Sequence, residues 1–295
     1  MPSHSDIPPR IRNGVYGVLG AGIEHSLSPS IFHRVFAALN WPAVYALYDL
    51  PPRRLGPFLR ACADASLVGL NVTMPHKTRI IGHLDQLDQT AAAIGAVNTV
   101  AVRGRSLVGY NTDAAGVTAA LWPHSAALRG GEALILGAGG AAQAVALALG
   151  DIFHMRRITL AARTPARARR ALDRLAIREQ GTELSVAEWR PADIRAQLER
   201  AALLVNATPL GGGVYAHLSP LPAGVPVGPS TIVFDLVYCP YPTRLLRRAK
   251  RAGCARVLGG WPMLVAQADA SFAIWTGRRF PGTVKRQLLQ NTETA

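Results

Sequence analysis

The chain has 295 residues, 49% of them hydrophobic, which suits two domains with buried cores rather than one small domain. Three cysteines and eight histidines are scattered along the sequence, so we expect neither a disulfide framework nor a metal site, and the first residues lack a secretory signal pattern, which indicates a cytoplasmic protein. The formal charge of +14 favours anionic ligands, but no basic patch interleaved with aromatic residues accompanies it, so we do not expect nucleic-acid binding.

The first predicted elements are a buried strand over residues 15–19 and a helix from Ser28 to about residue 39. Ser28 followed by Pro29 fits the N-cap and first turn of that helix. Capping does not account for the second hydroxyl, Ser26. Two serines beside a helix N-terminus suit a small carboxylate, and we predict such a ligand here.

Two more strands are predicted over residues 43–50 and 68–72, with a helix between them that ends near Ala65. The second of these strands delivers Thr73 and Lys77 to its carboxyl end, where ligands bind in open α/β sheets. A lysine alone would indicate only solvated surface. Its position after a buried strand favours a functional role.

A hairpin is predicted over residues 96–102 and 107–111, followed by a helix over residues 114–122. Asn98 lies at the beginning of the hairpin and Asp113 directly before the helix. Both positions are also compatible with an ordinary turn residue and a helix cap. The hairpin pattern alone leaves these alternatives open.

Residues 132–149 read as a buried strand, a glycine turn and an alanine-rich helix. Gly137, Gly139 and Ala142 fit the dinucleotide-binding pattern G-x-G-x-x-G/A, whose glycines let the backbone turn and approach a pyrophosphate at the helix N-terminus. The apolar run over residues 133–149 has 17 residues with three glycines and Gln143. We therefore expect a Rossmann crossover here rather than a membrane span.

The next Rossmann strand is predicted over residues 157–161, where an NAD enzyme would place an acidic residue after the strand. This chain has Arg163, Thr164 and Arg167 there instead, which suits the 2′-phosphate of NADP. Residues 114–295 carry 22 Lys and Arg against 11 Asp and Glu. A phosphate-rich cofactor accounts for part of this excess, and solvated surface accounts for most of it.

The remaining elements are a strand from residue 203 to Asn206, a strand over residues 232–236 and a helix over residues 243–251. Residues 216–230, rich in Pro and Gly, are predicted to be irregular surface. An apolar helix beginning near Pro262 carries Gln267, whose amide needs partners that substrate hydroxyls could supply.

Eight motifs in this order resemble those of the shikimate dehydrogenase family over nearly the whole chain. They lie at residues 26–29, 71–77, 95–99, 109–113, 137–141, 206–211, 235–238 and 263–267. The resemblance implies an α/β protein with an N-terminal open α/β substrate domain (residues 1–111 with 254–295) and an inserted Rossmann-type, doubly wound NADP-binding domain (residues 112–253).

The resemblance also implies roles for individual residues. Lys77 and Asp113 would form the catalytic pair. The substrate carboxylate would bind Ser26, Ser28 and Tyr238, and the ring hydroxyls would bind Thr73, Asn98 and Gln267. The residues implied to bind NADP are Gly137, Ala138, Gly139, Gly140, Ala141, Arg163, Thr164, Arg167, Asn206, Ala207, Thr208 and Gly260.

The implied reaction is the reversible, NADP-dependent reduction of 3-dehydroshikimate to shikimate, on the route to chorismate and the aromatic amino acids. The chain departs from the family at Ala21-Gly22, Phe32-His33, Ala162 and Pro262. Because most of these positions surround the expected substrate, a quinate or related cyclitol-acid dehydrogenase of a catabolic or specialised pathway is the alternative. A ligand sensor without turnover fits less well, since Lys77 and Asp113 are present. The expected partner is a small molecule, bound by a monomer or homodimer without membrane or nucleic acid.

Overall fold

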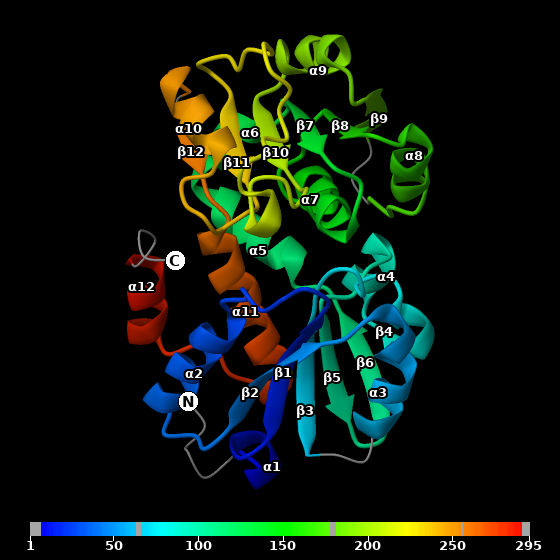
Figure 1. Cartoon of the computed structure of the whole chain (residues 1–295), viewed down its shortest axis with the longest axis vertical. Coiled ribbons are helices and arrows are strands. Elements are labelled where there is room, and N and C mark those ends of the chain that lie inside the picture. Colours follow the sequence, from blue (N-terminus) through cyan, green and yellow to red (C-terminus); the bar gives the residue numbers. More distant parts are fainter. Residues whose placement is uncertain (1–6, 63–65, 178–180, 255, 291–295) are drawn as a thin grey trace. The chain divides into compact units, whose positions relative to one another are not determined.

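The structure is a computed structural model that describes residues 7–62, 66–177, 181–254 and 256–290. The chain forms two compact units, which are described separately (Figure 1). The first lies within Met1–Thr112 and Val265–Asn291, and the second within Asp113–Leu264. Each contains one six-stranded sheet with helices, so the predicted α/β class is confirmed.

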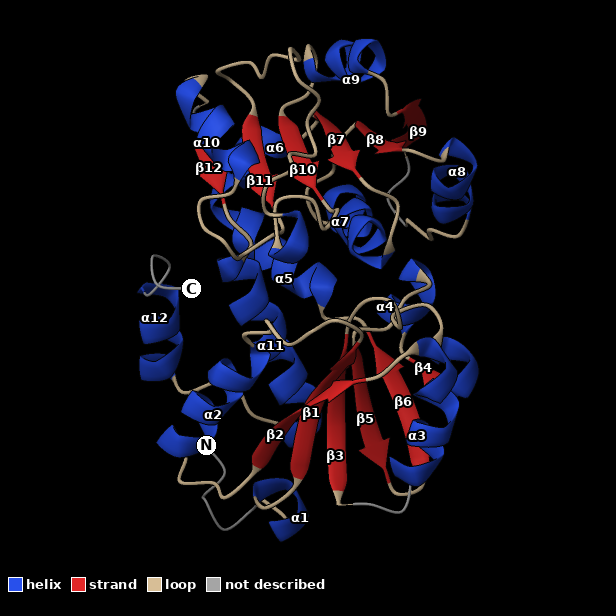
Figure 2. Ribbon diagram, in the orientation of Figure 1, coloured by secondary structure: helices blue, strands red, loops and turns tan. Residues whose placement is uncertain are grey.

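The sheet of the first unit has the strand order β2-β1-β3-β5-β6-β4 (Figure 2). Its strands are β1 (Val15–Gly20), β2 (Val44–Asp49), β3 (Leu67–Val72), β4 (Gln86–Leu87), β5 (Thr99–Arg103) and β6 (Ser106–Tyr110). Strands β2 and β3 pair parallel with β1, and β5 and β6 form the predicted antiparallel hairpin. The strands β1 and β3 therefore end at the same edge of the sheet.

Helices pack on both faces of this sheet. They are α1 (Pro9–Arg12), α2 (Ser28–Ala38), α3 (Leu55–Cys62), α4 (Gln89–Ile94), α11 (Trp261–Thr276) and α12 (Gly282–Gln290), with the 3₁₀ turns Pro52–Arg54 and Ile80–His83. Helix α3 shares a core with Leu19 and Leu70 of the sheet. The predicted end of this helix near Ala65 lies outside the described residues, and the described helix ends at Cys62.

An aromatic cluster fixes α2 and α11 on the first sheet. Tyr16 of β1 contacts Phe36 and Trp275, with ring centroids 5.3 Å and 5.2 Å apart. The Trp275 indole lies over Gly69, where an added Cβ would approach the indole nitrogen to 2.1 Å, and it donates a hydrogen bond of 2.9 Å to the Val100 carbonyl. A side chain at residue 69 would thus displace the helix that carries Gln267.

The second unit has a fully parallel sheet in the order β12-β11-β10-β7-β8-β9. Its strands are β7 (Glu132–Leu136), β8 (Arg157–Ala162), β9 (Glu183–Glu188), β10 (Leu203–Asn206), β11 (Ile232–Asp235) and β12 (Arg256–Leu258). Its helices are α5 (Asp113–Leu121), α6 (Ser125–Leu128), α7 (Gly140–Asp151), α8 (Pro165–Asp173), α9 (Pro191–Leu198) and α10 (Arg244–Arg251), with the 3₁₀ turns Trp122–His124 and Gly213–Tyr215. This is the predicted doubly wound, Rossmann-type arrangement.

Three local expectations differ from the structure. Strand β12 pairs with β11, so the second unit continues to Leu264 and does not end at Gly253. Residues 216–230 are irregular as predicted, but Leu221, Val225 and Val227 are buried in the core rather than exposed. Ser28 is the first helical residue of α2, since Leu27 occupies the N-cap position and no side chain caps this helix.

Candidate active site

In the first unit, the loops that follow β1 and β3 are joined by backbone hydrogen bonds. The Thr73 N–H donates to the Leu19 carbonyl at 2.8 Å, and the Ala21 N–H donates to the Met74 carbonyl at 3.0 Å. These contacts bring the loop with Ser26 and the loop with Lys77 to one edge of the sheet, as parallel strands require.

The Lys77 loop is held from both sides. The His76 ring is fully buried, and its Nε2 donates to the Leu50 carbonyl at 2.8 Å, since a carbonyl oxygen can only accept. The Lys77 carbonyl accepts a hydrogen bond of 2.8 Å from the Val97 N–H, next to Asn98. The Lys77 side chain itself is half-buried. The backbone is thus fixed, and the ammonium lies at the end of a long, adjustable side chain.

The two serines adopt different environments. The Ser28 N–H lies 3.4 Å from the Ser26 hydroxyl, which accepts from it. Ser28 is only 6% exposed, and its side chain hydrogen-bonds Tyr45. Burial raises the pKa of Tyr45 well above its usual range, so this phenol is neutral and donates to Asn71 Oδ1 at 2.7 Å. Ser26 remains half-buried, beside the N-terminus of α2.

Asn98 and Gln267, both predicted to bind substrate hydroxyls, meet in a buried polar network. Asn98 Nδ2 lies 3.3 Å from Gln267 Oε1 and 3.0 Å from the Thr112 hydroxyl. Asn98 Oδ1 accepts from the Thr112 N–H at 2.7 Å and from the Thr99 hydroxyl at 3.0 Å. The Asn98 side chain therefore fixes the backbone directly before Asp113.

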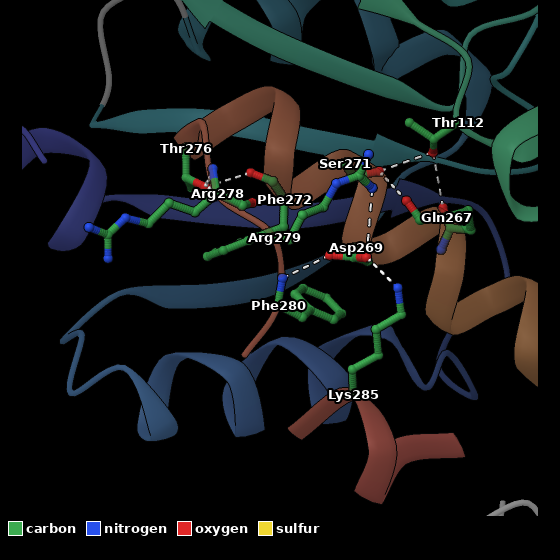
Figure 3. A network of polar contacts seen from close by, with 10 residues as sticks. All are labelled: Thr112, Gln267, Asp269, Ser271, Phe272, Thr276, Arg278, Arg279, Phe280 and Lys285. Carbon is green, nitrogen blue, oxygen red and sulfur yellow. Dashed lines mark hydrogen bonds and ion pairs between the residues drawn. The ribbon is translucent and has the colours of Figure 1, made fainter. Parts of the chain in front are cut away.

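Ser271 joins this network from the same face of α11 as Gln267, one helical turn further (Figure 3). Its hydroxyl lies 2.8 Å from the Thr99 hydroxyl and 3.1 Å from the Thr112 hydroxyl. Asn71 Nδ2 donates to it at 2.9 Å. Figure 3 also shows Asp269 on the opposite face of the helix, where it binds Lys285 at 2.7 Å.

Five residues of this network were not expected from the sequence: Tyr45, Asn71, Thr99, Thr112 and Ser271. Four of them are polar residues inside or next to a buried segment, and Tyr45 is a buried phenol on a strand with exposed neighbours; buried polar groups require partners. This need for partners can be inferred from the sequence, but the sequence does not show which polar residues pair with one another. The packing of α11 on the sheet determines these pairs.

The glycine loop of the second unit has the geometry that a dinucleotide requires. Gly137 has φ +123°, and an added Cβ would meet the Ala207 carbonyl oxygen at 3.0 Å, so a side chain is excluded there. At Gly139, which precedes α7, a Cβ would meet nothing within 4 Å. The backbone next to the N-terminus of α7 is thus open, and no side chain caps this helix.

The turn that follows β10 and faces this glycine loop is held by Asn206. Its Nδ2 donates to Asp235 Oδ1 at 2.8 Å and to the Leu210 carbonyl at 3.0 Å, and its Oδ1 accepts from the Thr208 N–H at 3.0 Å and hydroxyl at 2.7 Å. The Asn206 side chain therefore builds the turn that contacts Gly137.

The other predicted residues of the second unit lie as follows. Arg163, Thr164 and Arg167 are exposed after β8, with Thr164 at the N-cap position of α8. Tyr238 follows β11, and Asp113, only 4% exposed, begins α5. At Gly260 a Cβ would lie 2.1 Å from the Leu236 carbonyl oxygen, so close packing alone explains this glycine.

Comparison with known proteins identifies the family. The model of the shikimate dehydrogenase substrate binding domain matches residues 18–100. The NADP(+) shikimate dehydrogenase of Symbiobacterium thermophilum is 39% identical over 272 residues, 92% of each chain, and that of Moorella thermoacetica is 40% identical over 280 residues, 94% of this chain and 92% of the relative. The chain belongs to the shikimate dehydrogenase family.

A solved member of the shikimate dehydrogenase family agrees in structure. The shikimate 5-dehydrogenase of Thermus thermophilus, solved in complex with NADP(H) and shikimate, is 35% identical with a TM-score of 0.80 over 95% of this chain and 99% of that chain. In the described part of the present chain, no helix combines the length and apolar character needed to span a bilayer.

Two structural observations indicate that the residues of this shikimate dehydrogenase family member fit NADP. The first is the open backbone at Gly139, where a pyrophosphate could approach α7. The second is that Arg163 and Arg167 are exposed and form no ion pair with a carboxylate in the described residues. Both guanidinium groups would therefore be available to a 2′-phosphate.

Asp235, which holds Asn206 in this family member, gives a prediction on stability and pH. Its carboxyl group is fully buried, and burial raises its pKa to about 6, against hydrogen bonds from Thr243, Val237 and Asn206 that lower it. Because the folded pKa lies above that of the unfolded chain, the protonated form favours folding, and this contribution is lost as pH rises through 6. The loss is roughly 3 kcal/mol.

Replacing Asp235 with asparagine removes this titration. The free energy of unfolding of the unmodified chain, relative to that of Asp235→Asn, should fall as pH rises from 3.8 to about 6, between the pKa of the unfolded carboxyl group and that of the folded one, and should stay level above that range. Urea unfolding of both proteins at several pH values measures it. A difference that stays constant, or that grows with pH, would show that folding does not raise the pKa of this carboxyl group.

Proposed function

We propose that the chain is an NADP-dependent shikimate dehydrogenase that interconverts 3-dehydroshikimate and shikimate. The observation that carries this proposal is the identity of 39–40% over more than nine-tenths of the chain with NADP(+) shikimate dehydrogenases. The motifs that the sequence shares with the family include the two catalytic candidates, the six residues assigned to the substrate and the glycine loop at residues 137–141. The site residues below belong to the same proposal.

In the substrate half of the site, Ser26, Ser28 and Tyr238 bind the carboxylate. The hydroxyl of Ser26 beside the N-terminus of α2 supports this assignment, because a helix N-terminus favours negative charge. Thr73, Asn98 and Gln267 bind ring hydroxyls. The hydrogen bond between the Asn98 and Gln267 side chains supports a joint role, since it aligns two amides from distant parts of the chain.

The chemistry requires a proton at the substrate ketone. NADPH, when bound, would supply the hydride in the reducing direction and leave as NADP. Negative charge then develops on the carbonyl oxygen, and the Lys77 ammonium stabilises that charge and donates the proton. Asp113 orients this ammonium and binds a neighbouring hydroxyl. In the direction of oxidation, neutral Lys77 accepts the proton from the same hydroxyl.

Quinate is the competing substrate, because the chain departs from the family at Ala21 and Gly22, next to the serine loop. Initial rates with shikimate and quinate, each with NADP and NAD, separate the two. We expect the highest kcat/KM for shikimate with NADP. A higher kcat/KM for quinate would assign the catabolic alternative, and no oxidation of either acid would contradict the proposed function.

A further inference from the structure

One face of α10 carries four arginines. Arg244, Arg247, Arg248 and Arg251 are spaced i, i+3, i+4 and i+7, which places them along one side of the helix, while Leu245, Leu246 and Ala249 on the other side are buried in the core. Together with residues of the 219–223 segment, the arginines line a groove of about 540 Å³. None of the residues assigned to substrate or NADP lies in it.

The guanidinium groups are held by neutral partners. Arg248 donates to the carbonyls of Leu221, at 3.2 Å, and Val225, and Arg244 donates to the carbonyl of His217. Arg247 Nη1 donates to the Pro242 carbonyl at 2.7 Å. These contacts fix the position of each guanidinium but do not neutralise its charge. Because a guanidinium has five N–H donors, some of its donors remain available to a ligand.

The positive charge of the groove is not compensated by protein carboxylates. In the part of the chain that the structure describes, none of the four arginines forms an ion pair with Asp or Glu. Like charges at this helical spacing repel one another and destabilise a helix. An anion that bridges them would remove the repulsion.

We propose that this groove, called here the α10 groove, binds a small anion that carries several phosphate groups. The four Cα atoms span about 10 Å along the helix, which suits a compact polyanion better than the extended backbone of a nucleic acid. The groove is separate from the cofactor loop: α10 connects β11 to β12, whereas Gly137 and Arg163 follow β7 and β8, on the other side of β10.

Sodium tripolyphosphate is a suitable probe, titrated calorimetrically into the full chain at fixed ionic strength. We expect one binding site, and we expect Arg247→Gln/Arg251→Gln to bind about a hundredfold more weakly, because each charge-assisted contact is worth roughly tenfold or more. Both arginines are exposed, so the variant should fold. Without the anion, its melting temperature should equal or exceed that of the unmodified chain. If the double variant does not fold, binding of tripolyphosphate to Arg247→Gln alone is measured in its place.

Arg169→Gln/Arg170→Gln is the matched control, because it removes the same charge from exposed positions of another helix in this unit. It should bind tripolyphosphate as the unmodified chain does. Loss of binding in Arg163→Ala instead would place the anion in the cofactor site and overturn the proposal. Absence of binding, equal weakening in both double variants, or binding of duplex RNA without binding of tripolyphosphate would overturn it as well.

Discussion

Lys77→Ala should lower kcat for shikimate oxidation by about 10²–10⁴-fold, the usual contribution of a positioned acid or base. The Lys77 backbone is fixed by the Val97 N–H and by the buried His76 next to it, so removal of the side chain leaves the loop in place. The dissociation constant of shikimate should change much less, because the proposed carboxylate and hydroxyl partners remain. Single-turnover rates and equilibrium binding together measure the two effects.

Arg79→Ala provides the comparison, since Arg79 is an exposed cation two residues away in the same loop. Its turnover should match that of the unmodified enzyme. Asp113→Asn should also lower kcat. If the two residues act as a unit, the double variant Lys77→Ala/Asp113→Asn should lower kcat by a much smaller factor than the product of the two single factors. Near-normal turnover in Lys77→Ala, with only KM raised, would make this lysine a binding group.

Arg163→Ala should raise KM for NADP roughly ten- to hundredfold and affect KM for NAD little. A charge-assisted hydrogen bond to a phosphate is worth about 1.5–3 kcal/mol, and NAD lacks the 2′-phosphate that Arg163 would meet. Initial rates at saturating shikimate with each cofactor give the ratio. Arg169→Ala, an exposed arginine on α8, controls for the general loss of positive charge. If both cofactors were affected equally, Arg163 would not select for NADP.

The strands that are buried on both faces were predictable from the sequence, because they appear as short apolar runs followed by turn residues. Strands β1, β3, β7, β10 and β11 fall within one or two residues of their predicted positions. Strand β9 was missed, since Glu183–Glu188 lies at the sheet edge, is largely half-exposed and reads as a polar segment. The three residues of β12 are too short to carry a pattern.

For the site, the sequence indicated the positions at strand ends but not their partners. Asn98 and Gln267 were predicted to bind the same ligand, and their mutual hydrogen bond depends on how α11 packs on the sheet. Asn206 shows the reverse case: its side chain is used within the turn, which neither spacing nor residue type reveals. The role of Lys77 and Asp113 stays a prediction until the variants are measured.

The long separation in sequence between Asn71 and Ser271, 200 residues, also has a consequence for folding during translation. Strands β1 to β6 leave the ribosome first, but Trp275 and the other aromatic residues of α11 that cover one face of their sheet are among the last to be made. The second unit is nearly contiguous, within Asp113–Leu264, and has all its strands before α11 ends. The later-synthesised unit therefore completes its fold first, and until then the part of the N-terminal sheet that α11 covers stays exposed beside α2, a state in which chaperone binding would matter most.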